Sequence, residues 1–454
     1  MQNRPQNKNS SHNGTKYLIR RIEALLEVCS FCVIYFYVWK HFYRDQGFYP
    51  YYGNGKFILA GIYALLLLTV MYNCDGFKFG YLKFTDTMIA QWISIVLVNF
   101  ITFFQICLMA NHMLNAIPMI LFTIIGFALS ALLVYIYTAI YHSMYVPKNM
   151  VMISGSPGKS VLAGKMKTRS DKYNISKIIS ADNGLDSIIK GIEGFDAVVL
   201  DDVPAELRND VMKYCYGKCI RTYAVPKISD IINRGAEEIA LFDTPLLLIK
   251  GYGPTSLELF IKRVFDIVLG VLALILFSPF MIIIAIAIKL EDKGPVFYKQ
   301  ERVTLDHKNF EIIKFRSMVE NAEKAGEVIP AEDNDPRITK VGKIIRPTRL
   351  DELPQILNII KGDMSIVGPR PERIEHYEIY EKEIPEWSYR TKVKGGLTGY
   401  AQVYGKYNTS AYDKLRMDLM YIENYSLMLD IKIIFMTFQV LFKKEKTEGF
   451  NKES

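Results

Sequence analysis

The stretch that decides the fold is the apolar run 264–288, VFDIVLGVLALILFSPFMIIIAIAI. A helix of about 20 apolar residues spans a bilayer, so length alone predicts a membrane crossing. However, lysine and arginine flank both ends of the run, which the positive-inside bias disfavours for a crossing helix. In addition, Ser278 and Pro279 stand in its middle, where proline breaks the helical hydrogen-bond ladder. The sequence therefore favours a bent, re-entrant helix whose ends share one membrane face over a fifth span.

Upstream of this run, four apolar segments each have about the length of a membrane span. They cover about 22–39, 57–72, 88–109 and 117–141. No small-residue cleavage site follows the first segment, which indicates an anchor rather than a cleaved signal. Basic residues precede the first segment and follow the fourth, while the loop between the third and fourth contains none. This bias predicts a cytoplasmic N-terminus and a return of the chain to the cytoplasm before Pro147.

The composition agrees with a chain that is partly membrane and partly soluble. Half of the 454 residues are hydrophobic, and 55 Lys and Arg against 47 Asp and Glu leave a net charge of +8. This length suggests roughly three domains of about 150 residues and excludes a disulfide-stabilised mini-protein or a disordered chain. The six cysteines are scattered, which predicts reduced thiols. The basic excess flanks membrane segments or stands near a pair of carboxylates, so an anionic leaflet and phosphates are expected partners, and nucleic acid is not.

Between residues 149 and 250 the sequence becomes soluble, and strand-like runs alternate with helical ones, which predicts a small parallel α/β unit. The segment 155–160, GSPGKS, is similar to a phosphate-binding loop, but Ile153 stands where that pattern needs its first glycine. A plain strand-to-helix turn is therefore favoured over a nucleotide site. Asp201 and Asp202 follow a strand end, where α/β sheets often bind ligands, although a solvated loop is the favoured interpretation there.

The candidate chemistry lies beyond residue 289. Asp351 and Glu352 form an adjacent acidic pair that leucines flank and two arginines, Arg346 and Arg349, precede. Neighbours in a helix point about 100° apart, so the two carboxylates can serve different partners at one site. One can attack phosphorus while the other holds Mg²⁺, a hard cation that bridges carboxylates and phosphates. The alternative is an acidic pair that only stabilises the start of a helix.

Other basic and acidic residues extend this candidate site. Lys314 and Arg316 alternate with apolar residues, which predicts a strand with both cations on one face. These two cations could bind phosphate, or that face could simply be exposed to solvent. Arg370 stands between two prolines that stiffen its presentation, which favours phosphate binding over a surface turn. The segment 333–335, DND, matches a short metal motif of many nucleotide-sugar glycosyltransferases, but Pro336 after it indicates a turn.

Taken together, the segments between Lys262 and Phe442 closely resemble the bacterial sugar transferases, the monotopic polyprenyl-phosphate phosphoglycosyl transferases that begin exopolysaccharide and capsule synthesis. The resemblance rests on six motifs in family order, which is far more specific than any one of them. They are KFRSM at 314–318, LDELPQ at 350–355, GPRP at 368–371, LTGYAQV at 397–403, DLMYIENYS at 418–426 and LDIK at 429–432.

The resemblance implies a two-step reaction. Asp351 would attack the β-phosphate of a UDP-sugar, release UMP and carry the sugar phosphate, which undecaprenyl phosphate then accepts. Glu352 would ligate Mg²⁺, and Arg346 and Arg370 would neutralise phosphate charge. Lys314, Arg316 and Asp418 are implied as further substrate-binding residues.

The same resemblance implies the architecture and the location. It favours a re-entrant helix that spans residues 264–288, and it places the catalytic domain at the cytoplasmic face of the bacterial inner membrane. The N-terminal half resembles the larger family members, which add four spans and a Rossmann-like domain. The expected fold is therefore an α-helical membrane bundle, a small Rossmann-like α/β domain and a mixed α/β monotopic catalytic domain. The expected bounds are 1–146, 147–255 and 256–442, with a charged tail at 443–454.

Some features of function stay open in the sequence. Gly395, Tyr400 and Tyr404 stand where Pro, Trp and Asn are common in the family, so the sugar is not identified. A homodimer is a candidate assembly, because the four extra spans offer a surface for it. A non-catalytic membrane assembly factor and an ordinary glycosyltransferase that uses Asp333 and Asp335 are the alternatives, and the nucleotide product separates all three.

Overall fold

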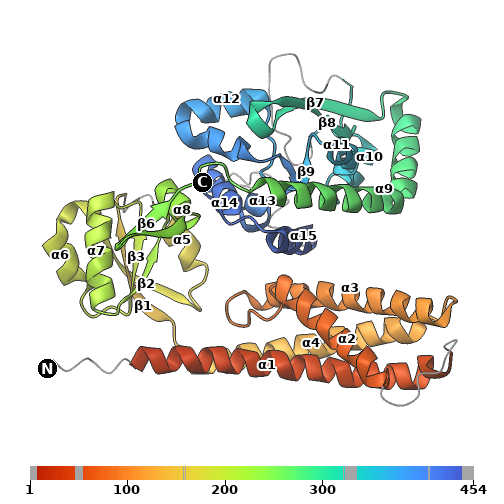
Figure 1. Cartoon of the computed structure of the whole chain (residues 1–454), viewed down its shortest axis with the longest axis horizontal. Coiled ribbons are helices and arrows are strands. Elements are labelled where there is room, and N and C mark those ends of the chain that lie inside the picture. Colours follow the sequence, from red (N-terminus) through yellow and green to blue (C-terminus); the bar gives the residue numbers. More distant parts are fainter. Residues whose placement is uncertain are drawn as a thin grey trace. The chain divides into compact units, whose positions relative to one another are not determined.

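The computed structural model describes residues 8–46, 55–156, 158, 160–320, 322, 335–406 and 409–441. The chain divides into two compact units, Met1–Pro226 and Lys227–Ser454, each of which is described by itself (Figure 1).

The first unit begins with a bundle of apolar helices. These are α1 (Lys8–Val38), α2 (Gly55–Asn73), α3 (Phe84–Ala110) and α4 (Ile117–Met144), with short π and 3₁₀ turns after α1 at Trp39–Tyr43 and Arg44–Gln46. All four predicted segments are thus helical. Five helices of the described residues, these four and one in the second unit, are long and apolar enough to cross a membrane, which indicates a membrane protein.

Polar side chains of the bundle face one another rather than the apolar exterior. The Tyr63 hydroxyl donates to the Asn99 amide oxygen at 3.0 Å, and the Gln91 amide donates to the buried Glu27 carboxylate at 3.0 Å. The rings of Tyr35 and Tyr63 stack with centroids 4.3 Å apart. Hydrogen-bonded polar groups inside an apolar bundle are the arrangement that a lipid environment demands.

After the bundle, the first unit contains a four-stranded sheet, and its strands lie in the order β2-β1-β3-β4 with every pairing parallel. Its elements are β1 (Lys148–Ser154), α5 (Val161–Lys167), β2 (Tyr173–Ser180), α6 (Leu185–Ile192), β3 (Ala197–Asp201), α7 (Ala205–Gly217) and β4 (Arg221–Ala224). The predicted small parallel α/β unit is confirmed, while its closer likeness to a Rossmann domain stays a prediction.

The second unit starts with α8 (Ile228–Arg234) and the hairpin β5 (Glu237–Leu241) and β6 (Thr244–Leu248), followed by the long helix α9 (Ser256–Asp292). The Thr255 hydroxyl and the Glu258 carboxylate cap the start of α9 reciprocally, and Lys293 ends it in a left-handed conformation. Figure 1 shows α9 changing direction along its length, and Pro279 lies inside the helix. Proline is an established cause of such bends.

Both halves of α9 are fixed to the second unit. In the first half, the Lys262 ammonium pairs with the buried Asp430 carboxylate at 2.6 Å, and Asp266 accepts the Ser365 hydroxyl at 2.7 Å. In the second half, the Glu291 carboxylate accepts the backbone N–H of Lys340 at 2.7 Å. Between these contacts, large apolar side chains are exposed, namely Leu272, Ile275, Leu276, Phe280, Ile282 and Ile283.

The rest of the second unit surrounds this helix. Its strands are β7 (Phe297–Val303) and β8 (Asn309–Phe315), which form an antiparallel hairpin, and the parallel pair β9 (Ser365–Val367) and β10 (Gly396–Thr398). Its helices are α10 (Lys340–Ile345), α11 (Gln355–Lys361), α12 (Ile374–Glu383), α13 (Tyr400–Tyr404), α14 (Ala411–Glu423) and α15 (Leu427–Leu441).

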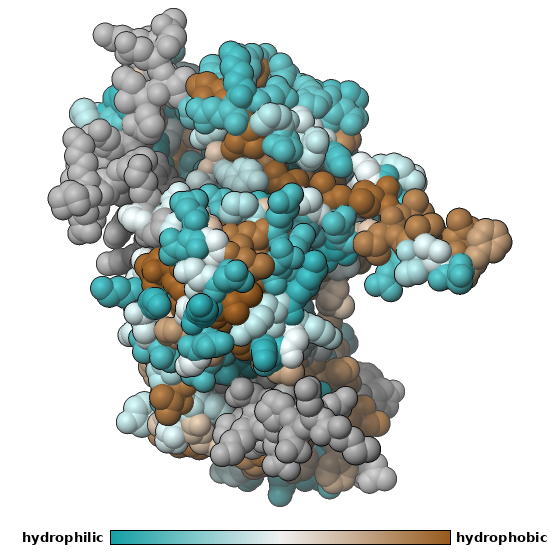
Figure 2. All heavy atoms as spheres, turned by 90° about the vertical axis from the view of Figure 1, so that its left-hand side faces the viewer, coloured by the Kyte–Doolittle hydropathy of each residue, from teal (hydrophilic) through white to brown (hydrophobic). Residues whose placement is uncertain are grey.

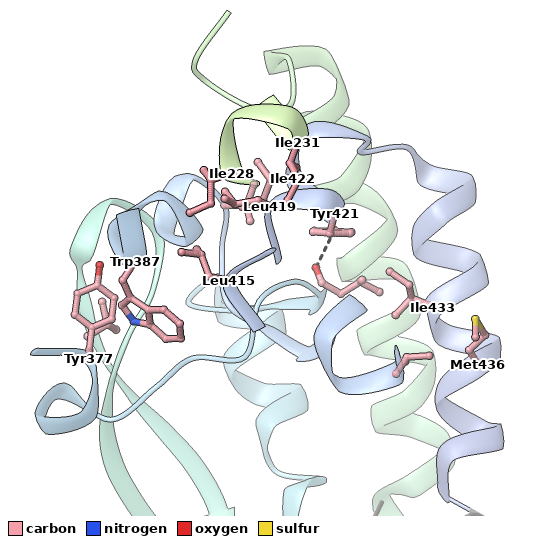
Figure 3. Packing of buried hydrophobic residues seen from close by; sticks show 14 of the residues in the cluster. Ile228, Ile231, Tyr377, Trp387, Leu415, Leu419, Tyr421, Ile422, Ile433 and Met436 are labelled. Atoms are coloured by element: carbon pink, nitrogen blue, oxygen red, sulfur yellow. Dashed lines mark hydrogen bonds between the residues drawn. The ribbon is translucent and has the colours of Figure 1, made fainter. Parts of the chain in front are cut away.

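The largest core cluster of this unit joins residues of α8, α12, α14 and α15 and includes the fully buried Trp387 (Figure 3). Tyr421 ties the cluster to the strands, because its hydroxyl contacts the Val367 carbonyl at 3.2 Å and the Asp430 carboxylate at 2.7 Å. Figure 2 shows apolar residues in brown at the surface among hydrophilic ones. Exposed apolar area beyond a few hundred Å² usually marks a membrane or partner contact.

Candidate active site

The acidic pair lies on a 3₁₀ turn, Leu350–Glu352, between α10 and α11. Arg349 precedes this turn in the left-handed conformation, with φ of 54°. Leu350 and Leu353 pack against the cluster that Ile284, Ile288, Phe315 and Ile345 form. The leucines of the LDEL motif therefore fix the turn to α9 and α10, and the two carboxylates between them are left for polar partners.

Two cations hold the Glu352 carboxylate. The Lys314 ammonium, from the end of β8, lies 2.9 Å from Oε1, and the Arg370 guanidinium lies 3.1 Å from the same oxygen. Burial opposes the ionisation of Glu352, but Lys314 and Arg370 outweigh it and hold its pKa well below the ordinary value. Burial also lowers the pKa of Lys314, against the attraction of Glu352. Glu352 is therefore an anion at neutral pH.

Asp351 has the opposite balance. Burial, together with the negative charge of Glu352, raises its pKa to about 6, although Lys314 and Arg346 act in the other direction. Two adjacent carboxylates with pKa values pushed apart are typical of sites where each has its own chemical task. Asp351 is charged at neutral pH and is held by fewer cationic contacts than its neighbour.

Arg346 and Arg370 complete the site from two directions. Arg346 ends α10, and its guanidinium donates to the Ser317 hydroxyl at 3.4 Å. The Arg370 side chain is 44% exposed, and its backbone carbonyl accepts a bond from the buried Arg390 at 3.0 Å. Five predicted residues, Lys314, Arg346, Asp351, Glu352 and Arg370, are thus brought together around one turn.

Arg316 and Asp418 have other partners. The strand β8 ends at Phe315, so Arg316 lies beyond it rather than on one strand face with Lys314. The Arg316 guanidinium instead binds the Asp292 carboxylate at 2.6 Å and the Pro295 carbonyl at 2.7 Å, at the end of α9.

Asp418 is fully buried and accepts two bonds from Arg390, at 2.7 and 3.0 Å. Burial raises the pKa of Asp418 to about 6 against the pull of Arg390. Because Arg390 also holds the Arg370 carbonyl, Asp418 supports the site through a second residue.

Among the described residues, the weaker motifs of the sequence do not form a second site. Asp333 and Asn334 lie outside the described residues, and Asp335 pairs with Arg337 at 2.6 Å. In the glycine-containing loop of the first unit, Pro157 and Lys159 lie outside the described residues, and the Ser160 hydroxyl donates to Asp201 at 2.6 Å. All six cysteines are free thiols.

The acidic pair fits the coordination habits of Mg²⁺. The described part of the chain contains no group of three or more His, Cys, Asp or Glu side chains placed to hold a metal alone. Mg²⁺ in phosphate-handling sites needs only one or two carboxylates, because substrate phosphates and waters supply the other oxygens. Lys314 and Arg370 both bind Oε1 of Glu352, which leaves Oε2 of Glu352 for such an ion.

Sequence reasoning missed Arg302 and Arg390. Arg302 lies in β7 beside the segment that carries Arg370, and Arg390 donates to the Arg370 carbonyl. Each is a single arginine without a repeated spacing, so only the fold reveals its position. The one sequence signal for Arg302 is that it lies within residues 262–442, the region that resembles the family.

The geometry can be set beside known proteins. The sequence model of the family described as bacterial sugar transferase matches residues 257–444, which include every site residue named above. A UDP-N-acetylgalactosamine-undecaprenyl-phosphate N-acetylgalactosaminephosphotransferase of Aeromonas hydrophila is 40% identical over 57% of this chain and 61% of its own length. A UDP-glucose:undecaprenyl-phosphate glucose-1-phosphate transferase of Klebsiella pneumoniae is 37% identical over 63% of this chain and 59% of its own.

A third relative is shorter. The exopolysaccharide production protein PSS of Rhizobium leguminosarum bv. phaseoli is 38% identical over 43% of this chain and over 100% of its own length. The chain thus spans less than two thirds of the first two relatives and the whole of the third. The resemblance drawn from the motifs is confirmed, and the chain belongs to the bacterial sugar transferase family.

Proposed function

We propose that this protein transfers a sugar 1-phosphate from a UDP-sugar to undecaprenyl phosphate, which yields undecaprenyl-diphosphate-sugar and UMP. The observation that carries the proposal is the adjacent pair Asp351–Glu352, in which Lys314 and Arg370 hold one carboxylate and leave the other less engaged. The names of the Aeromonas and Klebsiella relatives support the same substrates. The reaction would be the first step of exopolysaccharide, capsule or O-antigen synthesis.

The proposed first step is an attack of the Asp351 carboxylate on the β-phosphorus of the UDP-sugar. A bond forms between the carboxylate oxygen and phosphorus, the bond from phosphorus to the bridging oxygen breaks, and UMP leaves with that oxygen. In the second step, an oxygen of undecaprenyl phosphate attacks the same phosphorus and the aspartyl bond breaks, which restores the carboxylate. Covalent catalysis divides one difficult displacement into two easier ones.

The cations around the turn suit this chemistry. Phosphoryl transfer depends mainly on positioning and on stabilising the charge of the transferred group. Arg370 is partly exposed and touches Glu352, so it can bind a phosphate oxygen without leaving the site. Arg346 raises the positive potential at Asp351, which favours the ionised nucleophile.

We also propose that Glu352 holds Mg²⁺ together with the phosphates of the substrate, while Asp351 stays free to attack. When bound, the ion would supply a charge that neutralises phosphate oxygens and favours departure of UMP. Lys314 would keep Glu352 ionised and oriented for this task, because it holds Oε1 at 2.9 Å.

The proposed location is the cytoplasmic face of the bacterial inner membrane, where UDP-sugars are found, with α9 entering and leaving the same leaflet. Charged contacts fix both halves of α9 to one unit, and the exposed apolar side chains lie between them. A straight crossing would separate these two anchor points by the thickness of the bilayer core, about 30 Å.

The nucleotide product tests the function. Purified protein with Mg²⁺, undecaprenyl phosphate and a panel of UDP-sugars is expected to release UMP with at least one sugar. Release of UDP would instead support an ordinary glycosyltransferase, and no nucleotide release from the panel would support a non-catalytic assembly factor.

The variant Asp351→Asn tests the nucleophile. It is expected to abolish UMP release and any labelled sugar-phosphate adduct on the protein, because an amide cannot attack phosphorus as a carboxylate does. Asp413→Asn is the matched control, since Asp413 lies on α14 in the same unit and pairs with Arg416. Retained turnover in Asp351→Asn would rule out the covalent step.

A further inference from the structure

Arg302 is a partly buried cation whose hydrogen-bond partners carry no negative charge. It lies near the end of β7, where it bridges to Arg373 across an antiparallel contact. Its Nη2 donates to the Gln300 amide oxygen at 2.6 Å, and its Nη1 reaches the Pro371 carbonyl at a long 3.5 Å. Its Nε is buried and has no hydrogen-bond partner. An unsatisfied buried donor on a charged group is costly, so it calls for an explanation.

The surroundings of Arg302 are mainly positive. Burial and the like charges of Arg370 and Arg373 lower its pKa to about 10, and Glu372 and Tyr298 oppose this only in part. Among the described residues, no carboxylate forms an ion pair with Arg302. The two buried arginines among the described residues of the unit do pair with carboxylates, Arg316 with Asp292 and Arg390 with Asp418. Arginine side chains that gather at one place are a common construction of a phosphate site.

This cation-rich place adjoins the acidic turn. The backbone N–H of Val303 donates to the Glu372 carbonyl at 3.1 Å, which ties the end of β7 to the segment that carries Arg370. Arg370 in turn contacts Glu352 at 3.1 Å. The cations therefore extend from Lys314 beside Glu352, through Arg370, to Arg302.

We propose that Arg302 and Arg370 form a second phosphate-binding subsite beside the acidic turn. The unpaired Nε–H of Arg302 would donate a hydrogen bond to an oxygen of a phosphate group other than the one that Asp351 attacks. The proposal rests on the proposed function and deepens it. Two sources carry this chemistry, the nucleotide phosphate of the sugar donor and the phosphate of the lipid acceptor.

Binding is tested first with inorganic pyrophosphate as the probe and the full chain in lipid nanodiscs. The rise in Tm that pyrophosphate causes in the wild-type chain is expected to be lost in Arg302→Met and partly kept in Arg302→Lys, which retains the charge. Arg416→Met is the matched control, because Arg416 also has a buried unpaired Nε but pairs with Asp413 away from the acidic turn. An undiminished rise in both Arg302 variants would overturn the proposal.

Kinetics then identify the source of the phosphate. Exchange of labelled UMP into UDP-sugar needs no acceptor. If the donor phosphate occupies the subsite, Arg302→Lys raises the KM for UDP-sugar in this exchange by about 10- to 100-fold, the worth of a charged hydrogen bond. If the acceptor phosphate occupies it, exchange stays normal and the KM for undecaprenyl phosphate rises by that factor. Both KM values unchanged would refute the subsite.

The experiments distinguish a failure of the phosphotransferase function from a failure of the Arg302 subsite. A wild-type chain that gains stability from pyrophosphate through Arg302 but releases no UMP would refute the phosphotransferase function and support the anion site. If the wild-type chain releases UMP but Arg302→Met keeps the wild-type response to pyrophosphate, the phosphotransferase function is supported and the anion site is refuted.

Discussion

At the scale of single residues, the main result is that two carboxylates on adjacent positions ionise very differently. Glu352 receives Lys314 and Arg370 on one oxygen, whereas burial dominates at Asp351 and raises its pKa to about 6. The two residues share one 3₁₀ turn, so the difference arises from what each side chain meets and not from the backbone. The proposed division of labour between nucleophile and metal ligand follows from this asymmetry.

The raised pKa of Asp351 predicts an acid limb in the pH profile. The carboxylate must be ionised to attack, so kcat/KM for UMP release should level off above about pH 7, reach half its plateau near pH 6 and fall about tenfold per unit below about pH 5. An ordinary aspartate, with a pKa of about 3.9, would place this limb two units lower. kcat/KM is the right quantity because it reports groups of the free enzyme.

Asp418 provides the control for that profile, because burial raises its pKa to about 6 as well. Asp418→Asn is expected to lower the rate by loosening Arg390, yet to leave the midpoint of the limb near pH 6. A limb that disappears in Asp418→Asn, or one found near pH 4 in the wild type, would contradict the assignment to Asp351.

The sequence was informative for residues that stand in short motifs, and less so for those whose position depends on where an element ends. Lys314 and Arg370 meet Glu352 as expected for one site, although their roles stay predictions. Arg316 is two positions from Lys314, but β8 stops between them and turns Arg316 to Asp292. Arg302 was missed because its neighbour Arg373 is remote in sequence and only strand pairing joins them.

At the scale of elements, the sequence predicted correctly that α9 is a helix but not where the helix begins and ends. The apolar run 264–288 predicted a helix, and the structure extends it to Ser256–Asp292. The additional turns mix charged and apolar residues, and they form because Thr255 and Glu258 cap the start while Lys293 closes the end. In the first unit, β2 has a weak strand signal in the sequence, because several of its side chains are exposed polar ones and its apolar pattern is irregular.

The path of α9 can be tested with single cysteines and a membrane-impermeant thiol reagent, after the exposed Cys29 and Cys219 have been replaced. Leu257 and Leu290 are exposed near the two ends of the helix. On the re-entrant path, Leu257→Cys and Leu290→Cys both react only in inside-out vesicles. Met113→Cys, in the loop between α3 and α4, is expected to react only in whole cells and serves as the opposite control. Reaction of the two α9 sites from opposite faces would establish a fifth crossing instead.

At the scale of the whole molecule, the chain consists of two units with separate cores, and the family match lies entirely within the second. The sequence predicted this order of parts, from membrane helices to a small parallel sheet to the region with the chemistry. Its domain bounds at 146, 255 and 442 stay predictions, as does the homodimer, because a single chain does not reveal which surfaces meet a second copy. The sugar also stays open, since discrimination depends on pocket contacts rather than on motifs.

The division into units predicts that a chain restricted to residues 227–454 is active. It keeps the core around Trp387 and all residues of the acidic site, and the Rhizobium relative is matched over its whole length by a comparable stretch. Its kcat/KM for UMP release in nanodiscs is expected to lie within about tenfold of the full chain, or about 1.4 kcal/mol. Loss of folding or of UMP release in this shortened chain would assign the first unit an essential part in the site.

The contact of Leu350 and Leu353 with Ile284 and Ile288 has a kinetic consequence. These contacts join the acidic turn directly to α9, so on the proposed path the turn stays at a constant height above the bilayer. A lipid acceptor would then search for the site by diffusion in two dimensions, while the nucleotide arrives from three. The two substrates would differ in how their encounter rates scale, one with area density in the leaflet and the other with concentration in solution.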